Sequence, residues 1–324
     1  MIDWTPESIA FQIGPIPVFW YGVCYAIALA AAYLLMTVEA KRRGQDPELL
    51  ANGMIIIAVA ALIGGRAYHV IDQWALYKDD ISKIFLPPYT GLGAYGGLFT
   101  GFLALVAYTR YKKVPFWVWA DIAAPAVFLV QGIARWGNFF NQELYGPPTN
   151  LPWGIAIQCS KRIAEFACPA GSDPNATLGQ HFQPLFLYES ISGLLGCAFL
   201  LFLARRYRNR LRPGDLVAIF FIWYGVVRFC LEFLRSDNWT FFGVPVAQIV
   251  SLAFIVAAIL ILLYRHRGSG MAVPASGPSD GLMAEGATSA GGPSSASTAE
   301  PEKSPEAGIP PALEGSGPPA APPS

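Results

Sequence analysis

Long apolar runs recur along the first 267 residues of the chain and are separated by short polar segments. Each run is close to the ~20 residues that an α-helix needs to cross the hydrocarbon core of a bilayer. The pattern therefore predicts an all-α, polytopic integral membrane protein with about seven transmembrane helices. The runs cover residues 17–38, 50–71, 91–109, 115–136, 184–204, 215–234 and 244–264.

Composition supports this prediction and sets the C-terminal part of the chain apart. Charged residues make up 14% of the 324 residues, whereas roughly 25% is usual for a soluble domain. Residues 268–324 contain no Phe, Trp or Tyr but hold 11 of the 27 prolines. Such a segment cannot bury enough apolar surface to offset its ordering entropy. We expect a transmembrane domain at residues 1–267 and a disordered Pro/Ala/Gly/Ser-rich tail at 268–324.

The 22 basic residues balance the 22 acidic ones, but their positions are uneven. This balance excludes a nucleic-acid binder that relies on bulk positive charge. Thirteen of the basic residues follow the odd-numbered runs, so the positive-inside rule predicts an outer N-terminus and a cytoplasmic C-terminus. These residues are Lys41, Arg42, Arg43, Arg110, Lys112, Lys113, Arg205, Arg206, Arg208, Arg210, Arg212, Arg265 and Arg267.

Two cysteines, Cys159 and Cys168, share the longest outer loop, which covers about residues 138–183. Disulfides form and persist in the oxidising compartment outside the cytoplasmic membrane. We therefore expect a disulfide between them, which would make the loop a stiffened arm.

Arg135 belongs to the densest polar stretch at a membrane edge, which covers residues 131–146. Arg135, Asn138 and Asn141 recur every three residues, so a helix places them on one broad face. Glu143 follows where the helix is expected to end. A guanidinium with two amides beside it is well suited to hold a phosphate. The alternative is a helix end capped by amides, with Arg135 paired to Glu143.

A second stretch places Tyr224, Arg228, Glu232 and Arg235 at offsets of 0, 4, 8 and 11. At ~100° per residue these four side chains lie on one narrow stripe of a helix. In a lipid environment such a stripe must face the protein interior or a wet cavity. The alternative is an ion pair between Arg228 and Glu232 that only holds helices together.

Weaker signals come from three other runs. Glycines 93, 97 and 101 are spaced by four, which indicates close helix packing or backbone amides that approach a headgroup. Tyr21 opens the first run on the outer side, where aromatic residues often form an interfacial belt. Arg66 lies towards the outer end of the second run. All these signals fall near the outer face, so we expect an arginine-rich cavity there that fits an anionic lipid headgroup.

The stretch Arg135-x-Gly137-Asn138-Phe139-x-Asn141-x-Glu143-x-x-Gly146 is similar to the signature of prolipoprotein diacylglyceryl transferases. The similarity covers most of residues 15–265 in the same order. It extends to Tyr21-Gly22, Gly64-x-Arg66, Gly96-Gly97, Pro184-x-x-Leu187-Tyr188-Glu189 and Tyr224-Gly225-x-x-Arg228-x-x-x-Glu232-x-x-Arg235.

The resemblance implies an enzyme of the bacterial inner membrane with a periplasmic arm and seven helices. Such enzymes transfer the diacylglyceryl group from phosphatidylglycerol to the thiol of the lipobox cysteine of preprolipoproteins. A thioether forms and glycerol phosphate leaves, as the first step of lipoprotein maturation. The partners are thus phosphatidylglycerol, lipobox signal peptides and the bilayer. We expect no cofactor and no metal.

The resemblance and the residues together suggest roles. We expect Arg135 and Arg228 to bind the lipid phosphate, and Glu143 and Glu232 to hold the arginines or to help remove the thiol proton. Tyr95 stands where the family usually has the His proposed as the base, so we expect it to donate a hydrogen bond instead. The remaining substrate-binding candidates are Asn138, Asn141, Gly146, Tyr21, Arg66, Tyr224, Gly96 and Arg235.

A second departure from the family is Gln183, which stands where a His often precedes Pro184. His181 is near in sequence but is not the matched residue. The main alternative function is a seven-helix transporter of an anionic solute or lipid, since a stripe of arginines fits that too. A structural scaffold and an intramembrane protease are weaker alternatives.

Overall fold

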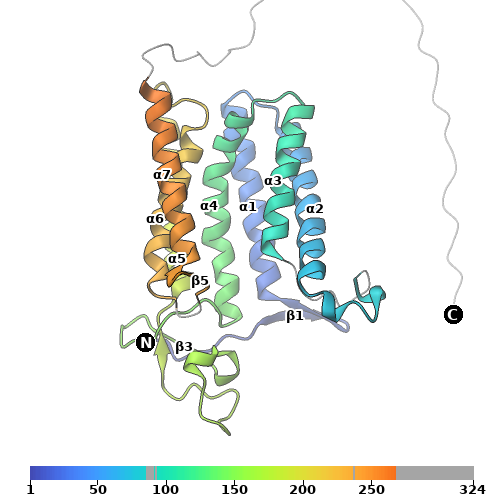
Figure 1. Cartoon of the computed structure of the whole chain (residues 1–324), viewed down its shortest axis with the longest axis vertical. Helices are drawn as coiled ribbons and strands as arrows, with labels where there is room; N and C mark the ends of the chain where they lie inside the picture. Colours follow the sequence, from blue (N-terminus) through green and yellow to red (C-terminus); the bar gives the residue numbers. More distant parts are fainter. Residues whose placement is uncertain (85–90, 92, 236–237, 268–324) are drawn as a thin grey trace, which may run out of the picture. The chain divides into compact units, whose positions relative to one another are not determined.

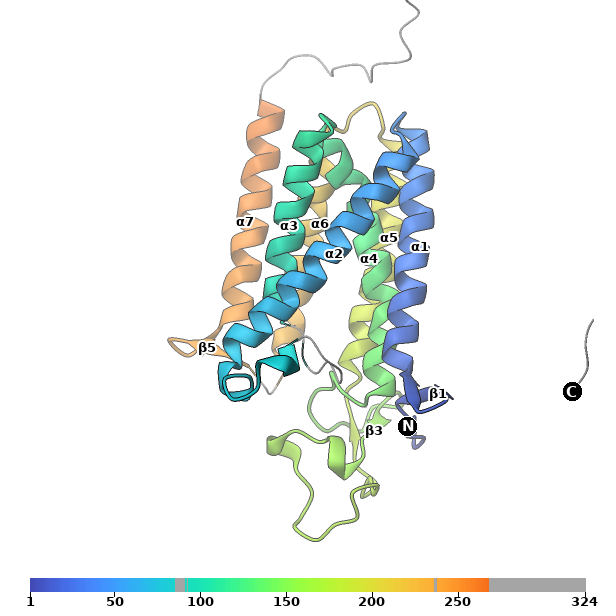
Figure 2. The same cartoon turned by 90° about the vertical axis from the view of Figure 1, so that its right-hand side faces the viewer.

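The computed structural model describes residues 1–84, 91, 93–235 and 238–267. Its described residues contain seven α-helices that lie side by side in one bundle (Figures 1 and 2). The expected tail at 268–324 lies outside the described residues. The helices are α1 (Trp20–Arg42), α2 (Pro47–Asp72), α3 (Ala94–Tyr111), α4 (Phe116–Phe140), α5 (Leu185–Arg206), α6 (Asp215–Glu232) and α7 (Val246–Arg267).

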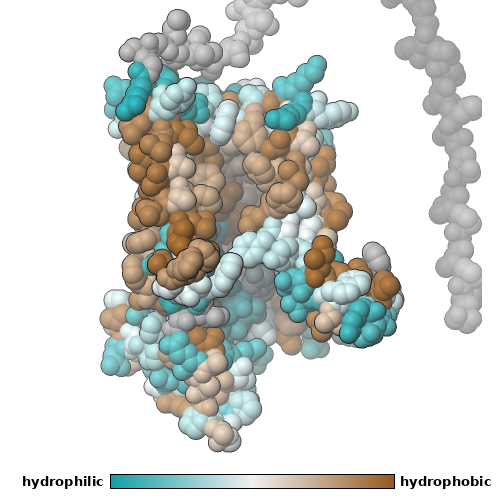
Figure 3. Space-filling view, viewed as in Figure 1, coloured by the Kyte–Doolittle hydropathy of each residue, from teal (hydrophilic) through white to brown (hydrophobic). Residues whose placement is uncertain are grey.

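Each predicted apolar run corresponds to one of these helices, so the predicted all-α membrane fold is confirmed. Five helices are long and apolar enough to cross a membrane, namely α1, α2, α4, α5 and α7. The other two, α3 and α6, have 18 residues each, and α6 carries Asp215, Arg228 and Glu232. Figure 3 shows a side of the bundle that is mainly hydrophobic, with hydrophilic residues gathered at its two ends.

The helix ends differ from the predicted runs by a few residues for physical reasons. The first run was expected from residue 17, but residues up to Phe19 belong to a hairpin of β1 (Ile9–Ile13) and β2 (Ile16–Phe19). At the other end, α1 continues through Lys41 and Arg42. Long basic side chains extend a helix past the apolar layer because their charged heads reach water.

Small residues bring helices of the bundle close together. A Cβ added at Gly96 would lie 2.3 Å from the Gly64 carbonyl oxygen, so α3 and α2 touch backbone to backbone there. A Cβ at Gly193 would lie 2.8 Å from the Phe128 carbonyl oxygen, which places α5 equally close to α4. In the third run itself, a Cβ at Gly97 would lie 3.1 Å from the Ala61 carbonyl oxygen of α2, so its glycine pattern is a packing signal, as expected for membrane helices.

One end of the bundle carries the basic residues that follow α1, α3, α5 and α7, and we call it the cationic end. Asp121 of α4 lies there and accepts hydrogen bonds from the backbone N–H groups of Gly214 at 2.7 Å and Val217 at 3.0 Å. It thus caps the N-terminus of α6 from a neighbouring helix. Asp215 accepts a hydrogen bond from the N–H of Arg212 and pairs with His266 of α7 at 2.9 Å.

The opposite end, which we call the arm end, carries the loop between α4 and α5. This arm contains the strands β3 (Ile155–Ala156) and β4 (His181–Phe182) and the 3₁₀ helices η3 (Cys159–Lys161) and η4 (Ala164–Phe166). The predicted disulfide between Cys159 and Cys168 is present, with the two Cα atoms 5.5 Å apart.

The N-terminal segment fastens the arm to the bundle. Ile2 pairs in parallel with Ile155, and Asp3 lies 2.7 Å from His181. His181 is therefore part of the arm's structure. Four short elements complete this end among the described residues. They are the strands β5 (Thr240–Phe241) and β6 (Val244–Pro245), which form a hairpin, and the 3₁₀ helices η1 (Trp74–Leu76) and η2 (Ile81–Ile84) after α2.

Candidate active site

The predicted site residues come from helix ends that meet at the arm end. The odd-numbered helices begin there and the even-numbered helices end there, so Tyr21 on α1, Arg135 on α4 and Arg228 on α6 lie at the same end of the bundle. Alternating helix direction brings these distant parts of the sequence together.

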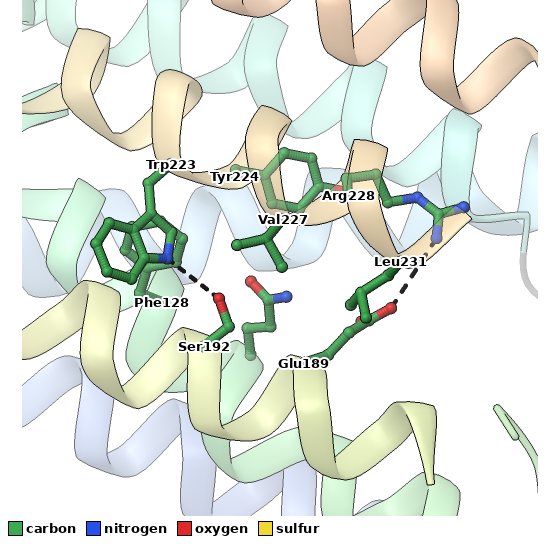
Figure 4. A pocket seen from close by; sticks show the side chains of 9 residues that line it. Phe128, Glu189, Ser192, Trp223, Tyr224, Val227, Arg228 and Leu231 are labelled. Carbon is green, nitrogen blue, oxygen red and sulfur yellow. Dashed lines mark hydrogen bonds and ion pairs between the residues drawn. The ribbon is translucent and has the colours of Figure 1, made fainter. Parts of the chain in front are cut away.

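A chain of ion pairs connects α4, α5 and α6. Arg135 Nε lies 2.6 Å from Glu189 Oε2, Arg228 Nη1 lies 4.0 Å from Glu189 Oε1, and Arg228 Nη2 lies 2.8 Å from Glu232 Oε2. Figure 4 shows Glu189 and Arg228 facing each other across the gap between α5 and α6. The two carboxylate side chains are only 5% and 3% exposed. One buried carboxylate thus holds two guanidinium groups that the sequence assigned to a phosphate.

Arg228 retains an N–H group without a hydrogen-bond acceptor. Among the described residues, Arg228 Nη1 is a buried atom without a hydrogen-bond partner, and Glu189 Oε1 lies 4.0 Å from it. A buried donor left unsatisfied costs about 1–3 kcal/mol. This group can therefore receive an acceptor, and a phosphate with three or more oxygens suits a pair of guanidiniums.

A small cavity of about 10 Å³ adjoins Arg228 and Glu189, and it is lined in part by Gln131, Ser192 and Tyr224. Figure 4 shows Ser192 and Tyr224 beside it, with Trp223 donating to Ser192. A cavity of this size holds roughly one water molecule. Tyr224 thus lies beside Arg228, as the stripe on α6 predicts.

The amide cluster lies at the end of α4. Asn138 accepts a long hydrogen bond of 3.4 Å from Arg135 and donates one of 2.8 Å to Glu143, and Asn141 donates one of 3.4 Å to Glu143. The helix ends at Phe140 with Asn141 as its C-cap, and Gln142 then has a left-handed φ of 56° that folds Glu143 back over Asn138. Arg135 pairs with Glu189 and not with Glu143, so the simple capped-end alternative is wrong.

Arg235 deviates from the predicted stripe. The helix α6 ends at Glu232, and Arg235 follows in a turn in which its N–H donates to the Glu232 carbonyl. Burial lowers the pKa of Arg235, and the charge of Arg228 lowers it further, while the charges of Glu189 and Glu232 raise it. Arg235 therefore lies in the electric field of the same cluster, although helix geometry does not put it there.

Gly146 lies where the arm passes this turn. A Cβ at Gly146 would lie 2.7 Å from the Leu234 carbonyl oxygen, next to Arg235 in sequence. Gly137, in the same motif, packs on Tyr21, where an added Cβ would lie 3.0 Å from the ring. The glycines of the motif thus provide close contacts and no chemistry of their own.

An open cleft of about 820 Å³ lies between the start of α1 and the end of α4. Its lining includes Tyr21, Asn141 and Glu143, three of the predicted site residues, and its volume is typical of a ligand site. The cleft therefore leads from the arm end to the amide cluster. On the side of the bundle, Figure 3 shows a hollow between α7 and α3 whose lower part is hydrophilic.

Three predicted residues make their contacts elsewhere, on the pair of helices α2 and α3. Arg66 donates to the carbonyls of Lys83 and Ile84 and so holds the segment that follows α2. Tyr95 is 72% exposed and its ring lies 6.2 Å from that of Tyr68. Gly96 packs against α2, as described above. In the described residues, Tyr95 makes no contact with the arginine cluster.

Glu189 is the residue that sequence reasoning left out of the candidate site. It is an acid inside a predicted span, and such a residue is functional by default. That signal was present, but the chain separates Glu189 from Arg135 by 54 positions, and periodicity within one helix cannot pair it with another.

Comparison with known proteins identifies the family of the chain. The sequence profile of the family described as prolipoprotein diacylglyceryl transferase matches residues 8–264. Three proteins of Streptococcus pneumoniae, from strains ATCC 700669 / Spain 23F-1, Taiwan19F-14 and Hungary19A-6, are each 36% identical over 262 residues. The matched region covers 81% of this chain and 95% of each relative, and all three carry the name phosphatidylglycerol–prolipoprotein diacylglyceryl transferase.

Proposed function

Because this chain belongs to the prolipoprotein diacylglyceryl transferase family, we propose that it transfers the diacylglyceryl group of phosphatidylglycerol to the lipobox cysteine of preprolipoproteins. The observation that carries the proposal is the pairing of Arg135 and Arg228 with the same buried carboxylate of Glu189, with one buried N–H donor of Arg228 left without an acceptor. A multi-helix membrane protein has little other use for such a costly arrangement.

The reaction is a substitution at the sn-3 carbon of the glyceryl group. The cysteine thiolate forms the new S–C bond, and the C–O bond to phosphate breaks with its electron pair going to the phosphate oxygen. The thiol proton goes to a base, and a thioether and glycerol phosphate result. The phosphate thereby changes from a monoanion to a dianion, so charge develops on the leaving group.

Arg135 and Arg228 bind the phosphate and stabilise that developing charge. Fixed cations in a site with little water are effective at this because their attraction to the charge is not screened. Asn138 and Asn141 orient the glycerol headgroup by their amides, next to Arg135. Tyr224 on α6 and Arg235 in the turn after it flank the phosphate. Gly146 keeps the arm close enough for this arrangement.

The carboxylates have two possible tasks. Glu232 neutralises Arg228 and holds it in position at 2.8 Å. Glu143, which faces the open cleft and accepts from two amides, is the carboxylate better placed to take the thiol proton. Tyr95 and Arg66 act at the α2 and α3 side of the site, with Gly96 holding these helices together.

The substrates approach from different directions. Phosphatidylglycerol comes from the bilayer through the hollow between α7 and α3, and the lipobox segment arrives with its mature part at the arm end. This requires the arm end and N-terminus outside the bacterial inner membrane, and the cationic end with the C-terminus in the cytoplasm. The distribution of basic residues supports this orientation.

The test uses purified protein in nanodiscs that contain phosphatidylglycerol, with a synthetic lipobox peptide. We expect a mass gain of one diacylglyceryl group on the peptide cysteine and an equal amount of glycerol phosphate, and neither with a Cys→Ser peptide. A known transferase assayed in parallel is the positive control. Movement of an anionic solute across the membrane without any adduct would establish the transporter alternative and reject the proposal.

A further inference from the structure

The cleft at the arm end has one basic residue in its wall. Of the described residues that line it, the charged ones are Glu143 after α4 and Lys161 on the arm. The rest of the wall is uncharged and comes from the N-terminal segment, the start of α1 and the residues Asn141 and Gln142 after α4. The cleft beside the candidate site is therefore lined by one carboxylate and one ammonium group.

Lys161 is held firmly by its backbone. Its N–H donates to the Gln158 carbonyl at 2.9 Å, and its own carbonyl accepts from the Tyr145 hydroxyl at 3.3 Å. Burial raises the pKa of the Tyr145 phenol, so this donor stays protonated at neutral pH. Lys161 lies within the short loop that the disulfide between Cys159 and Cys168 closes. The backbone from which the Lys161 side chain extends is therefore held in place.

The ammonium group itself is uncommitted. In the part of the chain that the structure describes, Lys161 forms no ion pair, whereas its neighbour Arg162 is bound to the Ile157 and Thr177 carbonyls and to Gln180. Arg162 therefore serves the arm's structure, and Lys161 is left facing the cleft. A side chain whose backbone is held in place and whose ammonium group has no partner is suited to an electrostatic contact with a ligand.

One species in the proposed reaction is small, anionic and water-soluble. Glycerol phosphate leaves with two negative charges, while the diacylglyceryl product and the lipidated peptide stay with the membrane. On its way out through the cleft the dianion must pass Glu143, whose negative charge repels it once the thiol proton has passed to water. A cation in the wall of the same cleft offsets that repulsion and favours release to the water side.

Building on the proposed function, we propose that Lys161 binds the departing glycerol phosphate and guides it out of the cleft. Lys161 is then a binding residue for the product of the reaction. The contact is electrostatic and partly exposed, so we expect a modest effect on affinity and a clear dependence on salt.

The experiment measures binding of glycerol 1-phosphate to the full chain in nanodiscs, by ³¹P line broadening, independently of transfer. We expect Lys161→Ala to weaken binding about fivefold, Lys161→Glu to weaken it more, and Lys161→Arg to restore it. The difference between wild type and Lys161→Ala should vanish at 1 M salt. Product inhibition of transfer should follow the same order.

The matched control is Lys78→Glu, which makes the same charge change on an exposed lysine between η1 and η2, outside the cleft. It should leave glycerol phosphate binding unchanged. Equal binding by wild type and Lys161→Glu would overturn the proposal, and a raised KM for the lipobox peptide with unchanged binding would assign Lys161 to the peptide. Absence of any thioether product defeats the proposed function instead, whatever the binding result.

Discussion

Glu189→Ala is the substitution that most sharply tests how the site is held together. Glu189 Oε2 lies 2.6 Å from Arg135 Nε and its Oε1 lies 4.0 Å from Arg228 Nη1. At an effective dielectric constant of ~20 these separations correspond to about 6 and about 4 kcal/mol of attraction before desolvation is counted. Removing one partner of a buried pair typically costs about 3–5 kcal/mol.

Glu189→Ala mainly removes the ion-pair partner of Arg135. Arg228 keeps Glu232 at 2.8 Å, whereas Glu189 is the only carboxylate that pairs with Arg135 among the described residues. We expect Glu189→Ala to lower kcat/KM by about 10²–10³-fold, the usual loss when one stabilising donor is displaced. Glu189→Gln keeps the shape and one acceptor, so its loss should be smaller.

A double-mutant cycle in the transfer assay decides the role. If Glu189 acts through Arg135, Arg135→Ala combined with Glu189→Ala is no slower than Arg135→Ala alone, because the two changes remove one interaction. Ser190→Ala is the control: its hydroxyl donates to the Gly132 carbonyl at 2.6 Å and has no link to the arginines. The reasoning is refuted if the loss of rate in the double variant equals the product of the two single losses. It is also refuted if Glu189→Ala transfers at the wild-type rate.

Three further changes have specific expected outcomes. Gly146→Ala places a Cβ 2.7 Å from the Leu234 carbonyl, so we expect at least about tenfold slower transfer in the same assay, with normal insertion in membranes. Tyr95→His should stay within about threefold of wild type, since the ring is exposed, and an inactive variant would indicate a phenol-specific role. Cys159→Ser removes the disulfide to Cys168, which stabilises the arm by about 2–4 kcal/mol. The variant should therefore show faster proteolysis of the arm than wild type, with unchanged proteolysis of the helices. Equal rates of arm proteolysis in the variant and wild type would contradict this expectation.

The sequence predicts the helices well because each apolar run has a single explanation. A stretch such as residues 244–264, with no charge, can only be a membrane helix. The residues at which the helices begin and end are predicted less well. The hairpin of β1 and β2 displaces the start of α1 to Trp20, and the basic residues after the runs continue the helices beyond the apolar layer.

The site is predictable in part. Contacts within one helix, such as Arg228 with Glu232, follow from a spacing of four residues, and the structure has this pair. Contacts between helices depend on which faces pack together, which periodicity does not contain. Hence Glu189 was not assigned to the arginines, and Arg235 was assigned to a helix that ends three residues earlier.

The central claim is that Arg135 and Arg228 stabilise the phosphate as it leaves. The most direct measurement is the single-turnover rate of diacylglyceryl transfer by Arg228→Ala in nanodiscs, with correct folding checked by protease resistance. The account predicts a rate at least about 10²-fold below wild type, with partial recovery in Arg228→Lys, which restores the charge but not the planar fork. A rate in Arg228→Ala equal to that of wild type would contradict it.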